Sequence, residues 1–338
     1  MNVPMITDVL KTYLMRRRLP NAAGSYLSYH LSITTKRVWH GFYPPAIMIE
    51  PTNICNLRCP LCPSGNGGME RARGMMTIQR YKKIIREIRS HIGTLILWNQ
   101  GEPFLHPDIY TMFDFAVKEG MYVLTSTNFS LEIDHIKLID SGLQHLIISM
   151  DGISNTTYDQ YRVNGDYDLV LHNMKELIRI KKLRHSRHPY IIWQFIVMKH
   201  NEHEIPAVKQ MARRLGVDKL EIKTAQIYAQ DDMQVFIPSD AKYSRYHKSE
   251  GEFRIKAELL NRCRRLWTQP VVNWDGEVAV CCYDKDVSFP IGNVDDEGFY
   301  RLWCSTAFND LRRDILHRRK DFEICRNCGE GIRLKVKN

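Results

Sequence analysis

The chain of 338 residues lacks the segment types that would place it in a membrane or an export pathway. No apolar run approaches the roughly 18–20 residues that a membrane-spanning helix needs. The first 20 residues contain no uninterrupted apolar core followed by a small-residue cleavage site, so no secretory signal is predicted. There is no internal repeat, and a hydrophobic fraction of 44% excludes a fully disordered chain. We therefore expect a globular cytoplasmic protein.

Acidic residues are scarce at the N-terminus, where Asp8 is the only carboxylate in residues 1–45. The whole chain carries 48 Lys and Arg against 38 Asp and Glu, a formal charge of +10. Half of this excess comes from Lys11, Arg16, Arg17, Arg18, Lys36 and Arg37. Apolar residues between Met5 and Leu14 predict an amphipathic helix near Thr7–Arg18. We expect this basic helical extension, residues 1–45, to pack on the rest of the molecule or on a partner protein rather than on lipid or nucleic acid.

From residue 46 the chain alternates short apolar runs with amphipathic segments, which is typical of a parallel sheet covered by helices. The predicted strands are Ala46–Glu50, Leu95–Trp98, Tyr122–Ser126, His145–Ser149, Tyr190–Met198 and Leu220–Lys223. The predicted helices are Thr77–His91, Asp108–Glu119, Glu132–Ser141, Asp168–Leu183 and Glu204–Leu215. Residues 46–224 are thus predicted to form an α/β sheet, open or closed as a barrel, with the active site at the carboxyl ends of its strands.

The pattern changes after residue 224. Residues 225–262 are polar and irregular, and we interpret them as a linker with one helix. Residues 263–338 are cysteine-rich and contain a predicted hairpin of Val271–Asn273 and Val278–Cys281, which turns at Asp275-Gly276. A helix over Phe299–Leu316 follows. We expect this last segment to form a separate small domain.

Nine cysteines are many for a cytoplasmic chain, because the reducing pool disfavours disulfides, so metal or redox chemistry is the leading interpretation. Cys55, Cys59 and Cys62 form C-x3-C-x2-C in the loop after the first predicted strand. No cysteine follows before Cys263, so the fourth ligand of a closed zinc or iron–sulfur site is not nearby. Three thiolates on a 4Fe–4S cluster leave one iron open to a substrate or cofactor. The spacing favours iron–sulfur over zinc, with inert thiols third.

The segment C-N-L-R-C-P-L-C, residues 55–62, is very similar to the signature of radical S-adenosylmethionine (SAM) enzymes. Three further motifs resemble the family in the expected order, namely Gln100-Gly101-Glu102-Pro103, Ser126-Thr127-Asn128 and Ser149-Met150-Asp151-Gly152. The resemblance implies that Glu102 receives the amino group of SAM. It places further cofactor contacts at Gly101, Ser126, Asn128, Ser149, Asp151, Arg162 and Gln194.

What the resemblance implies is a partial (β/α)6 TIM-like barrel over residues 46–224, with a SAM-binding 4Fe–4S cluster on Cys55, Cys59 and Cys62. Such a cluster, reduced by a flavodoxin- or ferredoxin-type donor, cleaves SAM to a 5′-deoxyadenosyl radical that removes a hydrogen atom from the substrate. Two positions depart from the family pattern. Leu61 stands where an aromatic residue usually packs on adenine, and Gln100 replaces the first glycine of Gly-Gly-Glu.

Four later cysteines, Cys263, Cys281, Cys325 and Cys328, could form a zinc ribbon. Beside the first motif they instead resemble the four-cysteine form of the SPASM/twitch domain of radical SAM enzymes, which implies one fully ligated auxiliary 4Fe–4S cluster. Their spacing is similar to that of relatives that dehydrogenate the aminocyclitol 2-deoxy-scyllo-inosamine. Cys282 is a candidate catalytic hydrogen-atom donor, as in aminoglycoside epimerase relatives, or a buried small hydrophobe.

We therefore expect a radical SAM enzyme that acts on a small polar substrate (a sugar, aminocyclitol or nucleotide-linked compound) and oxidises it with the auxiliary cluster as electron acceptor. Two alternatives are epimerisation with Cys282 as donor and modification of a ribosomally made peptide. About 45 residues precede the first strand, too few for the leader-peptide-binding module of many peptide-modifying relatives, which favours a small substrate. A non-enzymatic alternative is a basic zinc protein that binds nucleic acid, but aromatic and basic residues do not interleave as in RNA-binding motifs.

Overall fold

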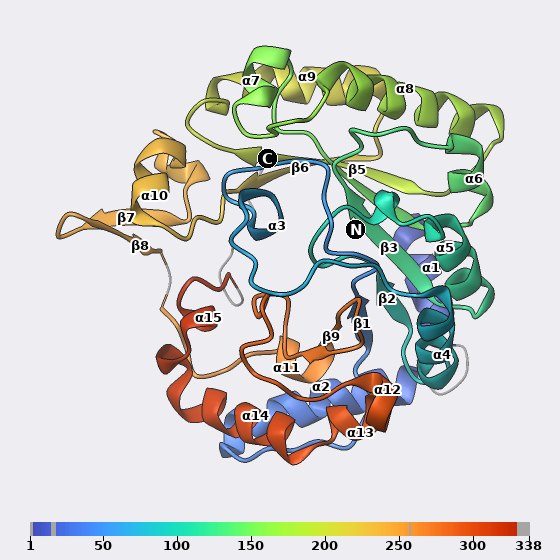
Figure 1. Ribbon diagram of the computed structural model, residues 1–338, viewed down its shortest axis with the longest axis vertical. Helices are drawn as coiled ribbons and strands as arrows, with labels where there is room; N and C mark the ends of the chain where they lie inside the picture. Colours follow the sequence, from blue (N-terminus) through green and yellow to red (C-terminus); the bar gives the residue numbers. More distant parts are fainter. Residues whose placement is uncertain (1–2, 15–17, 257, 330–338) are drawn as a thin grey trace.

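The computed structural model describes residues 3–14, 18–256 and 258–329. Its centre is a sheet with strand order β10-β9-β1-β2-β3-β4-β5-β6, and the connecting helices lie around its outside (Figure 1). Neighbours from β1 to β6 are all parallel. These six strands are β1 Ala46–Ile49, β2 Thr94–Ile96, β3 Tyr122–Thr127, β4 His145–Ser149, β5 Tyr190–Val197 and β6 Lys219–Thr224. The predicted partial barrel of parallel strands is confirmed.

The helices between these strands follow the apolar periodicity of the sequence. The larger ones are α4 Ile78–Ile88, α5 Ile109–Lys118, α6 His135–Asp140, α8 Tyr167–Leu183 and α9 Ile205–Leu215. Two shorter ones are α3 Pro63–Asn66 and α7 Asn155–Asp159. In α4, the Thr77 hydroxyl accepts a hydrogen bond from Arg80 N at the first turn, and the face with Tyr81, Ile84 and Ile88 is buried. The core therefore lies between the sheet and these helices.

The C-terminal segment joins the sheet of the barrel directly. Its hairpin consists of β9, Val271–Val272, and β10, Val278–Ala279, as predicted. The sequence did not predict that β9 pairs in parallel with β1, with Met48 opposite Val271 and Ile49 opposite Val272. The helices of this segment are α11 Arg265–Thr268, α12 Val294–Glu297, α13 Phe299–Trp303, α14 Thr306–Arg318 and α15 Glu323–Arg326.

Two sequence predictions in the second half of the chain need correction. The single helix predicted over Phe299–Leu316 is two helices, because the Ser305 hydroxyl accepts a hydrogen bond from Phe308 N and starts α14 as a new helix. The predicted linker does contain a helix, α10 Gln230–Phe236, but also an unpredicted antiparallel hairpin of β7, Tyr246–Ser249, and β8, Glu252–Ile255. This hairpin extends to the left in Figure 1.

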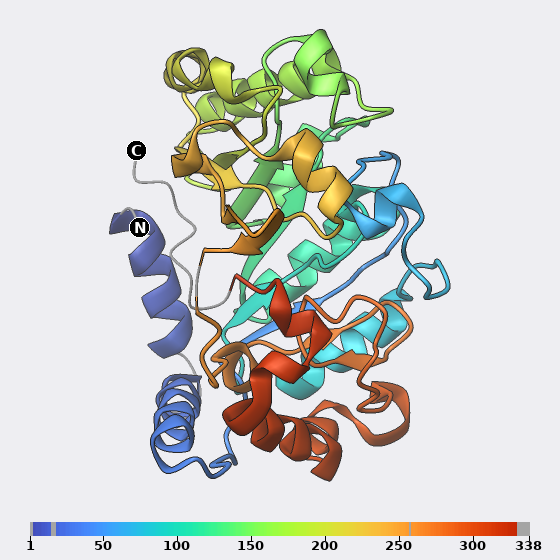
Figure 2. The same ribbon diagram turned by 90° about the vertical axis from the view of Figure 1, so that its left-hand side faces the viewer.

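The N-terminal extension forms α1, Val3–Leu14, and α2, Arg18–Thr35, along one side of the molecule (Figure 2). The helix predicted near Thr7–Arg18 thus begins earlier and ends at Leu14, and residues 15–17 lie outside the described residues. The Tyr13 hydroxyl donates to Pro45 O at 2.6 Å, and the buried Arg18 donates to Arg89 O at 3.0 Å. The extension therefore packs on the barrel.

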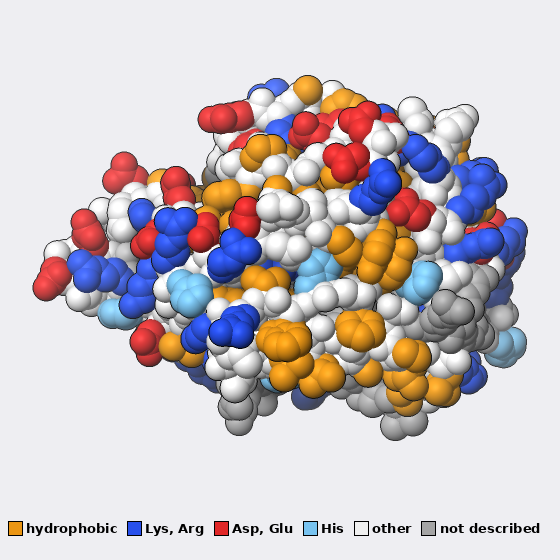
Figure 3. Space-filling view, turned by 90° about the horizontal axis from the view of Figure 1, so that it is seen from below, with side chains coloured by type: hydrophobic (Ala, Val, Ile, Leu, Met, Phe, Trp, Pro, Cys, Tyr) orange, Lys and Arg blue, Asp and Glu red, His pale blue; other side chains and the backbone are white. Residues whose placement is uncertain are grey.

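The opposite face of α1 and α2 is apolar and exposed. Seen from below, hydrophobic side chains gather at the lower right of the molecule, with no acidic side chains among them (Figure 3). The exposed large hydrophobic residues of the two helices are Leu10, Leu14, Leu19, Tyr26, Leu27 and Leu31. No helix within the described ranges is both long and apolar enough to span a bilayer. A partner protein at this extension stays a prediction.

Candidate active site

The first three cysteines lie in a tight loop after β1. Cys62 N donates to Cys59 O at 3.1 Å, and the Cys55 sulfur accepts a hydrogen bond from Leu57 N at 3.4 Å. Leu57 and Leu61 hold the loop in an apolar cluster with residues after β5 and β6. Leu61, where the family usually has an aromatic residue, therefore serves here as a core side chain. Burial raises the pKa of the Cys55 thiol to about 12, so a metal must displace its proton on binding.

Gly101 brings the loop after β2 into contact with the segment that leads to Cys55. Its φ is +73°, and a Cβ at this position would lie 2.6 Å from Thr52 O and 2.7 Å from Ile54 O. Only glycine fits such an approach without displacing backbone. The Gln100 side chain, in place of a glycine, accepts a hydrogen bond from the Ser64 hydroxyl at 3.0 Å. Gln100 thus adds a second link between this loop and the cysteine loop.

Glu102 is buried and joins the ends of β2 and β3. Its carboxylate accepts hydrogen bonds from the Thr127 hydroxyl at 2.8 Å, from Asn128 N at 2.7 Å and from Phe104 N at 3.1 Å. Burial raises the pKa of Glu102 to about 7, although the three hydrogen bonds lower it. A carboxylate has about four acceptor positions, so three bonds leave room for one more donor. The structure therefore shows a loop-capping role for Glu102 that is compatible with the predicted contact to an amino group.

Asn128 and Arg162 place polar nitrogen atoms beside two cysteine sulfurs. Asn128 Nδ2 lies 3.8 Å from Cys55 Sγ and donates to Asn56 Oδ1 at 2.9 Å. Arg162 Nη1 lies 3.9 Å from Cys59 Sγ. Both contacts are of the kind that stabilises thiolate sulfur in a cluster.

Asp151 holds Arg162 in place. Arg162 Nε donates to Asp151 Oδ2 at 2.7 Å, and Asp151 Oδ1 accepts from Ile196 N at 2.6 Å. Asp151 is completely buried, so it acts by fixing the orientation of the Arg162 guanidinium toward Cys59.

The remaining predicted contacts meet on β3, β4 and β5. Ser149 and Gln194 are opposite each other in the register of β4 and β5, and Gln194 Nε2 donates to the Ser149 hydroxyl at 3.4 Å. Gln194 Oε1 accepts a hydrogen bond from Lys223 Nζ at 2.6 Å. Ser126 lies at the end of β3 and is half-buried. Lys223 was not predicted as a site residue. Its position near the carboxyl end of β6, where active-site residues of parallel sheets lie, was the signal that could have identified it.

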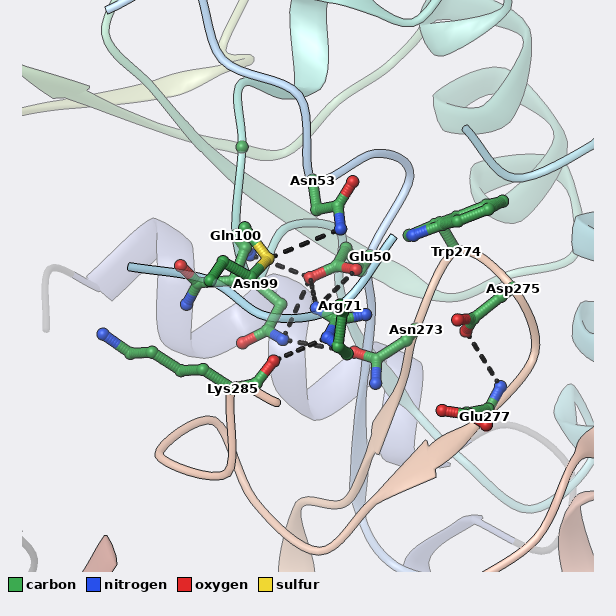
Figure 4. Close-up of polar contacts among 12 residues, drawn as sticks. Glu50, Asn53, Arg71, Asn99, Gln100, Asn273, Trp274, Asp275, Glu277 and Lys285 are labelled. Carbon is green, nitrogen blue, oxygen red and sulfur yellow. Dashed lines mark hydrogen bonds and ion pairs between the residues drawn. The ribbon is translucent and has the colours of Figure 1, made fainter. Parts of the chain in front are cut away.

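A buried ion pair links the barrel to the C-terminal segment, and the sequence analysis missed it. Arg71 Nη2 lies 3.1 Å from both carboxylate oxygens of Glu50, and Arg71 Nε donates to Lys285 O at 2.6 Å (Figure 4). Asn99 Nδ2 donates to Glu50 at 3.2 Å and approaches Asn273 Oδ1 at 3.4 Å. Neither Glu50 nor Arg71 belongs to a motif, so the sequence carried no local signal for this pair.

The four C-terminal cysteines line one small cavity, the C-terminal cavity. Its cysteine lining is Cys263, Cys281, Cys325 and Cys328. Arg319, which donates to Arg262 O at 2.6 Å, also lines it. Four thiolates carry excess negative charge, which the guanidinium balances. The residues present therefore fit a four-cysteine cluster.

A single metal ion suits neither cysteine group as well. Within the parts of the chain that the structure describes, no three His, Cys, Asp or Glu side chains converge closely enough to hold one metal ion. In a 4Fe–4S cluster the cysteines bind different irons, so they need not converge on one point.

A second, larger cavity with about 800 Å³ of empty space, the central cavity, lies between the barrel and the C-terminal segment. Its lining comes from β1, from β2 and the residues after it, from the residues after β6, from α11 and its C-cap, and from the residues after β10: Met48, Ile96, Trp98, Asn99, Gln100, Gln226, Tyr228, Arg265, Gln269, Cys282, Tyr283 and Lys285. Cys282 Sγ accepts a hydrogen bond from Arg265 Nη1 at 3.6 Å. Cys304 instead ends α13 and packs against the main core.

Comparison with known families agrees with this geometry. Residues 49–209 match the family model described as Radical SAM superfamily, and residues 263–329 match the SPASM iron–sulfur cluster-binding domain. The chain belongs to the radical SAM superfamily. As a radical SAM enzyme with a SPASM domain, it uses SAM and two 4Fe–4S clusters. The residues described above fit both clusters, with the first three cysteines at one and the four C-terminal cysteines at the other.

Curated relatives of this radical SAM enzyme share about half of its length. The chain is 29% identical over 188 residues to a PqqA peptide cyclase of Bradyrhizobium diazoefficiens, which covers 55% of this chain and 47% of the relative. It is 30% identical over 176 residues to an AdoMet-dependent heme synthase of Methanosarcina barkeri, covering 51% of this chain and 48% of the relative. The chain thus spans about half the length of these relatives.

Solved structures of radical SAM enzymes share the fold over most of the chain. Streptococcus suis SuiB bound to SAM has a TM-score of 0.61 at 14% identity and covers 80% of this chain and 68% of its own. BtrN in complex with AdoMet and 2-DOIA has a TM-score of 0.53 at 16% identity, covering 86% and 95%. The anSMEcpe enzyme with bound AdoMet has a TM-score of 0.57 at 13% identity, covering 84% and 87%. These similarities establish the fold.

Proposed function

We propose that this radical SAM enzyme removes a hydrogen atom from a small polar substrate in the central cavity, and that the substrate is then oxidised with the auxiliary cluster as electron acceptor. The observation that carries this proposal is the position of the cavity. Its lining joins residues of the barrel strands to Cys282, which follows the auxiliary ligand Cys281 directly. When bound, the reduced SAM cluster and SAM supply the 5′-deoxyadenosyl radical.

In this proposal the chain holds and orients the reactants. Cys55, Cys59 and Cys62 bind the first cluster, with Arg162 beside Cys59. Glu102 offers its remaining acceptor position to the SAM amino group. The amide side chains that line the central cavity, among them Asn99, Gln226 and Gln269, contact the hydroxyl groups of a polar substrate. A flavodoxin- or ferredoxin-type donor supplies the electron.

Anaerobic reconstitution with iron and sulfide, followed by assay of 5′-deoxyadenosine, tests the core of this proposal. The wild-type enzyme should cleave SAM, and the variant with alanine at Cys55, Cys59 and Cys62 should not. Cys304→Ala is the matched control, because Cys304 packs in the core outside both cysteine sets, and it should keep activity. SAM cleavage in the triple variant, or zinc in place of iron, would contradict the proposal.

Epimerisation is a second candidate fate of the substrate radical, and the position of Cys282 in the lining of the central cavity favours it. A thiol there can return a hydrogen atom that exchanges with solvent. Oxidation remains our preference, because a cluster with four cysteine ligands accepts an electron without binding substrate. In deuterated water, oxidation predicts a product without solvent deuterium at the reacting carbon. One deuterium in an unoxidised product, lost in Cys282→Ala, would establish epimerisation.

Peptide modification is an alternative that several relatives support. These include the PqqA peptide cyclase, SuiB bound to precursor peptide SuiA, and anSMEcpe with a bound peptide. We prefer a compact polar substrate because several amide side chains line the central cavity. SAM-cleavage assays that compare short peptides with small polar compounds distinguish the two, because the correct substrate accelerates 5′-deoxyadenosine formation.

A further inference from the structure

We propose that the substrate carries an oxyanion, a phosphate or a carboxylate, which the ammonium group of Lys285 binds in the central cavity. This inference rests on the proposed function, because it names the substrate class of the same cavity. Within the small polar compounds considered above, it selects acidic or phosphate-linked sugars, including nucleotide-linked ones, over amino-bearing cyclitols.

The backbone of Lys285 is anchored, whereas its side chain is directed elsewhere. Lys285 O accepts the hydrogen bond from Arg71 Nε, and Arg71 is in turn fixed by buried Glu50. The side chain of Lys285 extends away from this ion pair (Figure 4). The ion pair thus fixes the base of a lysine that lines the cavity, which is how a binding residue is preorganised.

No described carboxylate forms an ion pair with the ammonium group of Lys285; the groups that attract it when ionised are Cys62, Cys282 and Asp286. The Lys285 Nζ lies 4.7 Å from the centre of the Tyr228 ring, a cation–π contact across the cavity. The side chain of Lys285 is half-buried. A buried ammonium is costly unless it is paired, so a bound anion would stabilise it.

Charges around the cavity also favour an anion. Lys285 and Arg265 are the charged residues in its lining, and no described Asp or Glu belongs to that lining. The neighbouring carboxylates lie outside the lining and have partners of their own: Glu50 pairs with Arg71, Asp284 accepts from Ser288 N, and Asp286 accepts from Glu70 N. A substrate amine would therefore meet two cations and no carboxylate in the lining, which is electrostatically unfavourable.

A hydroxyl-binding group completes the pattern. Asn99 lines the cavity, and its Oδ1 atom is buried without a hydrogen-bond partner among the described residues. An unpaired buried acceptor is costly, and a hydroxyl donor from the ligand would satisfy it. Lysine and asparagine together suit a compound that has both an oxyanion and a hydroxyl group.

Ligand binding to the SAM-loaded, unreduced holoenzyme tests this inference with glucose 1-phosphate, glucuronate, glucose and glucosamine as probes. The intrinsic fluorescence of Trp98, which lines the cavity, reports binding, and Trp98→Phe identifies its signal. Glucose 1-phosphate or glucuronate should bind more tightly than glucose and glucosamine. The preferred anion should bind about tenfold or more weakly to Lys285→Met, given the usual strength of a charged hydrogen bond, and nearly normally to Lys285→Arg. Lys175→Met, an exposed lysine of α8, is the matched control and should bind like wild type.

Tight binding of either anion supports the inference. The comparison of glucose 1-phosphate with glucuronate shows whether the cavity prefers a phosphate or a carboxylate. Equal anion binding by Lys285→Met and wild type would overturn the inference, as would tighter binding of glucosamine than of both anions. Loss of SAM binding in Lys285→Met would assign the lysine to the cofactor and also overturn it. The proposed function fails separately, if wild type does not cleave SAM when reduced.

Discussion

Replacing Arg71 with alanine should destabilise the enzyme by leaving the Glu50 carboxylate buried without its cation. Glu50 is fully buried and the Arg71 side chain is 6% exposed. Removing one partner of such a pair typically costs about 3–5 kcal/mol. Unfolding entropy of about 2.1 cal/mol/K per residue gives roughly 0.7 kcal/mol/K for 338 residues. The melting temperature of the reconstituted enzyme should therefore fall by about 4–7 °C.

The loss should also depend on pH. Burial raises the pKa of Glu50, and Arg71 acts against that rise, so Arg71→Ala raises the pKa further. A carboxyl group whose pKa is raised by folding loses stability as pH increases through the raised pKa, because the unfolded chain ionises first. The deficit of Arg71→Ala should thus be larger at pH 8 than at pH 5.5.

Anaerobic thermal denaturation of matched variants checks both effects. Arg73→Ala removes an exposed arginine two residues away and should melt like wild type. Replacing both partners, as Glu50→Leu with Arg71→Met, should recover most of the loss, since no buried charge remains. If Arg71→Ala melts like Arg73→Ala, or shows the same deficit at both pH values, the electrostatic reasoning is refuted.

Three further predictions concern the clusters and SAM. Reconstituted wild type should contain about eight irons, and a variant without the four C-terminal cysteines about four; zinc in that segment would contradict the assignment. Gly101→Ala should lower SAM cleavage at least tenfold because its Cβ meets Thr52 O, whereas Gly251→Ala, also at positive φ but in open space, should not. SAM binding, measured by titration, should strengthen as pH rises through about 7, where Glu102 ionises, and Glu102→Gln should remove that dependence.

The sequence predicted the barrel well because each of its elements carries a local pattern. β3 and α4 are long enough for alternating or helical periodicity to show which face is buried. α2 lacked such a signal, because its buried face carries small polar residues and its exposed face carries the apolar ones. It buries Ser25, Ser28 and Ser32 against the protein and leaves leucines exposed, so its apolar residues do not indicate the packed face. Residue patterns fail where small side chains make the contact.

The sequence predicted which residues belong to the candidate site but not the contacts among them. Motif order placed Glu102 after the second strand and Asp151 after the fourth, and the structure has them there, whereas Arg162 lies in the loop between α7 and α8. That Asp151 binds Arg162, and that Glu102 binds Thr127, depends on the spatial approach of loops from different strands. The Glu50–Arg71 pair had no local signal, because its role depends on a segment more than 200 residues further along the chain.

The pairing of β9 with β1 explains how one small C-terminal segment can serve the chemistry of the barrel. β1 leads into the loop of the SAM-cluster cysteines, and the β9–β10 hairpin leads to Cys281 and Cys282. Two backbone pairs, at Met48 and Ile49, therefore fix the hairpin beside the strand that carries the first cluster. Hydrogen abstraction and electron transfer both require reacting groups at set distances, and a misplacement of about 1 Å can cost about 100-fold in rate. A change that loosens β9 without removing any cysteine should accordingly leave both clusters and SAM cleavage in place while lowering substrate turnover, because the fault then lies in the alignment of the two halves of the cavity.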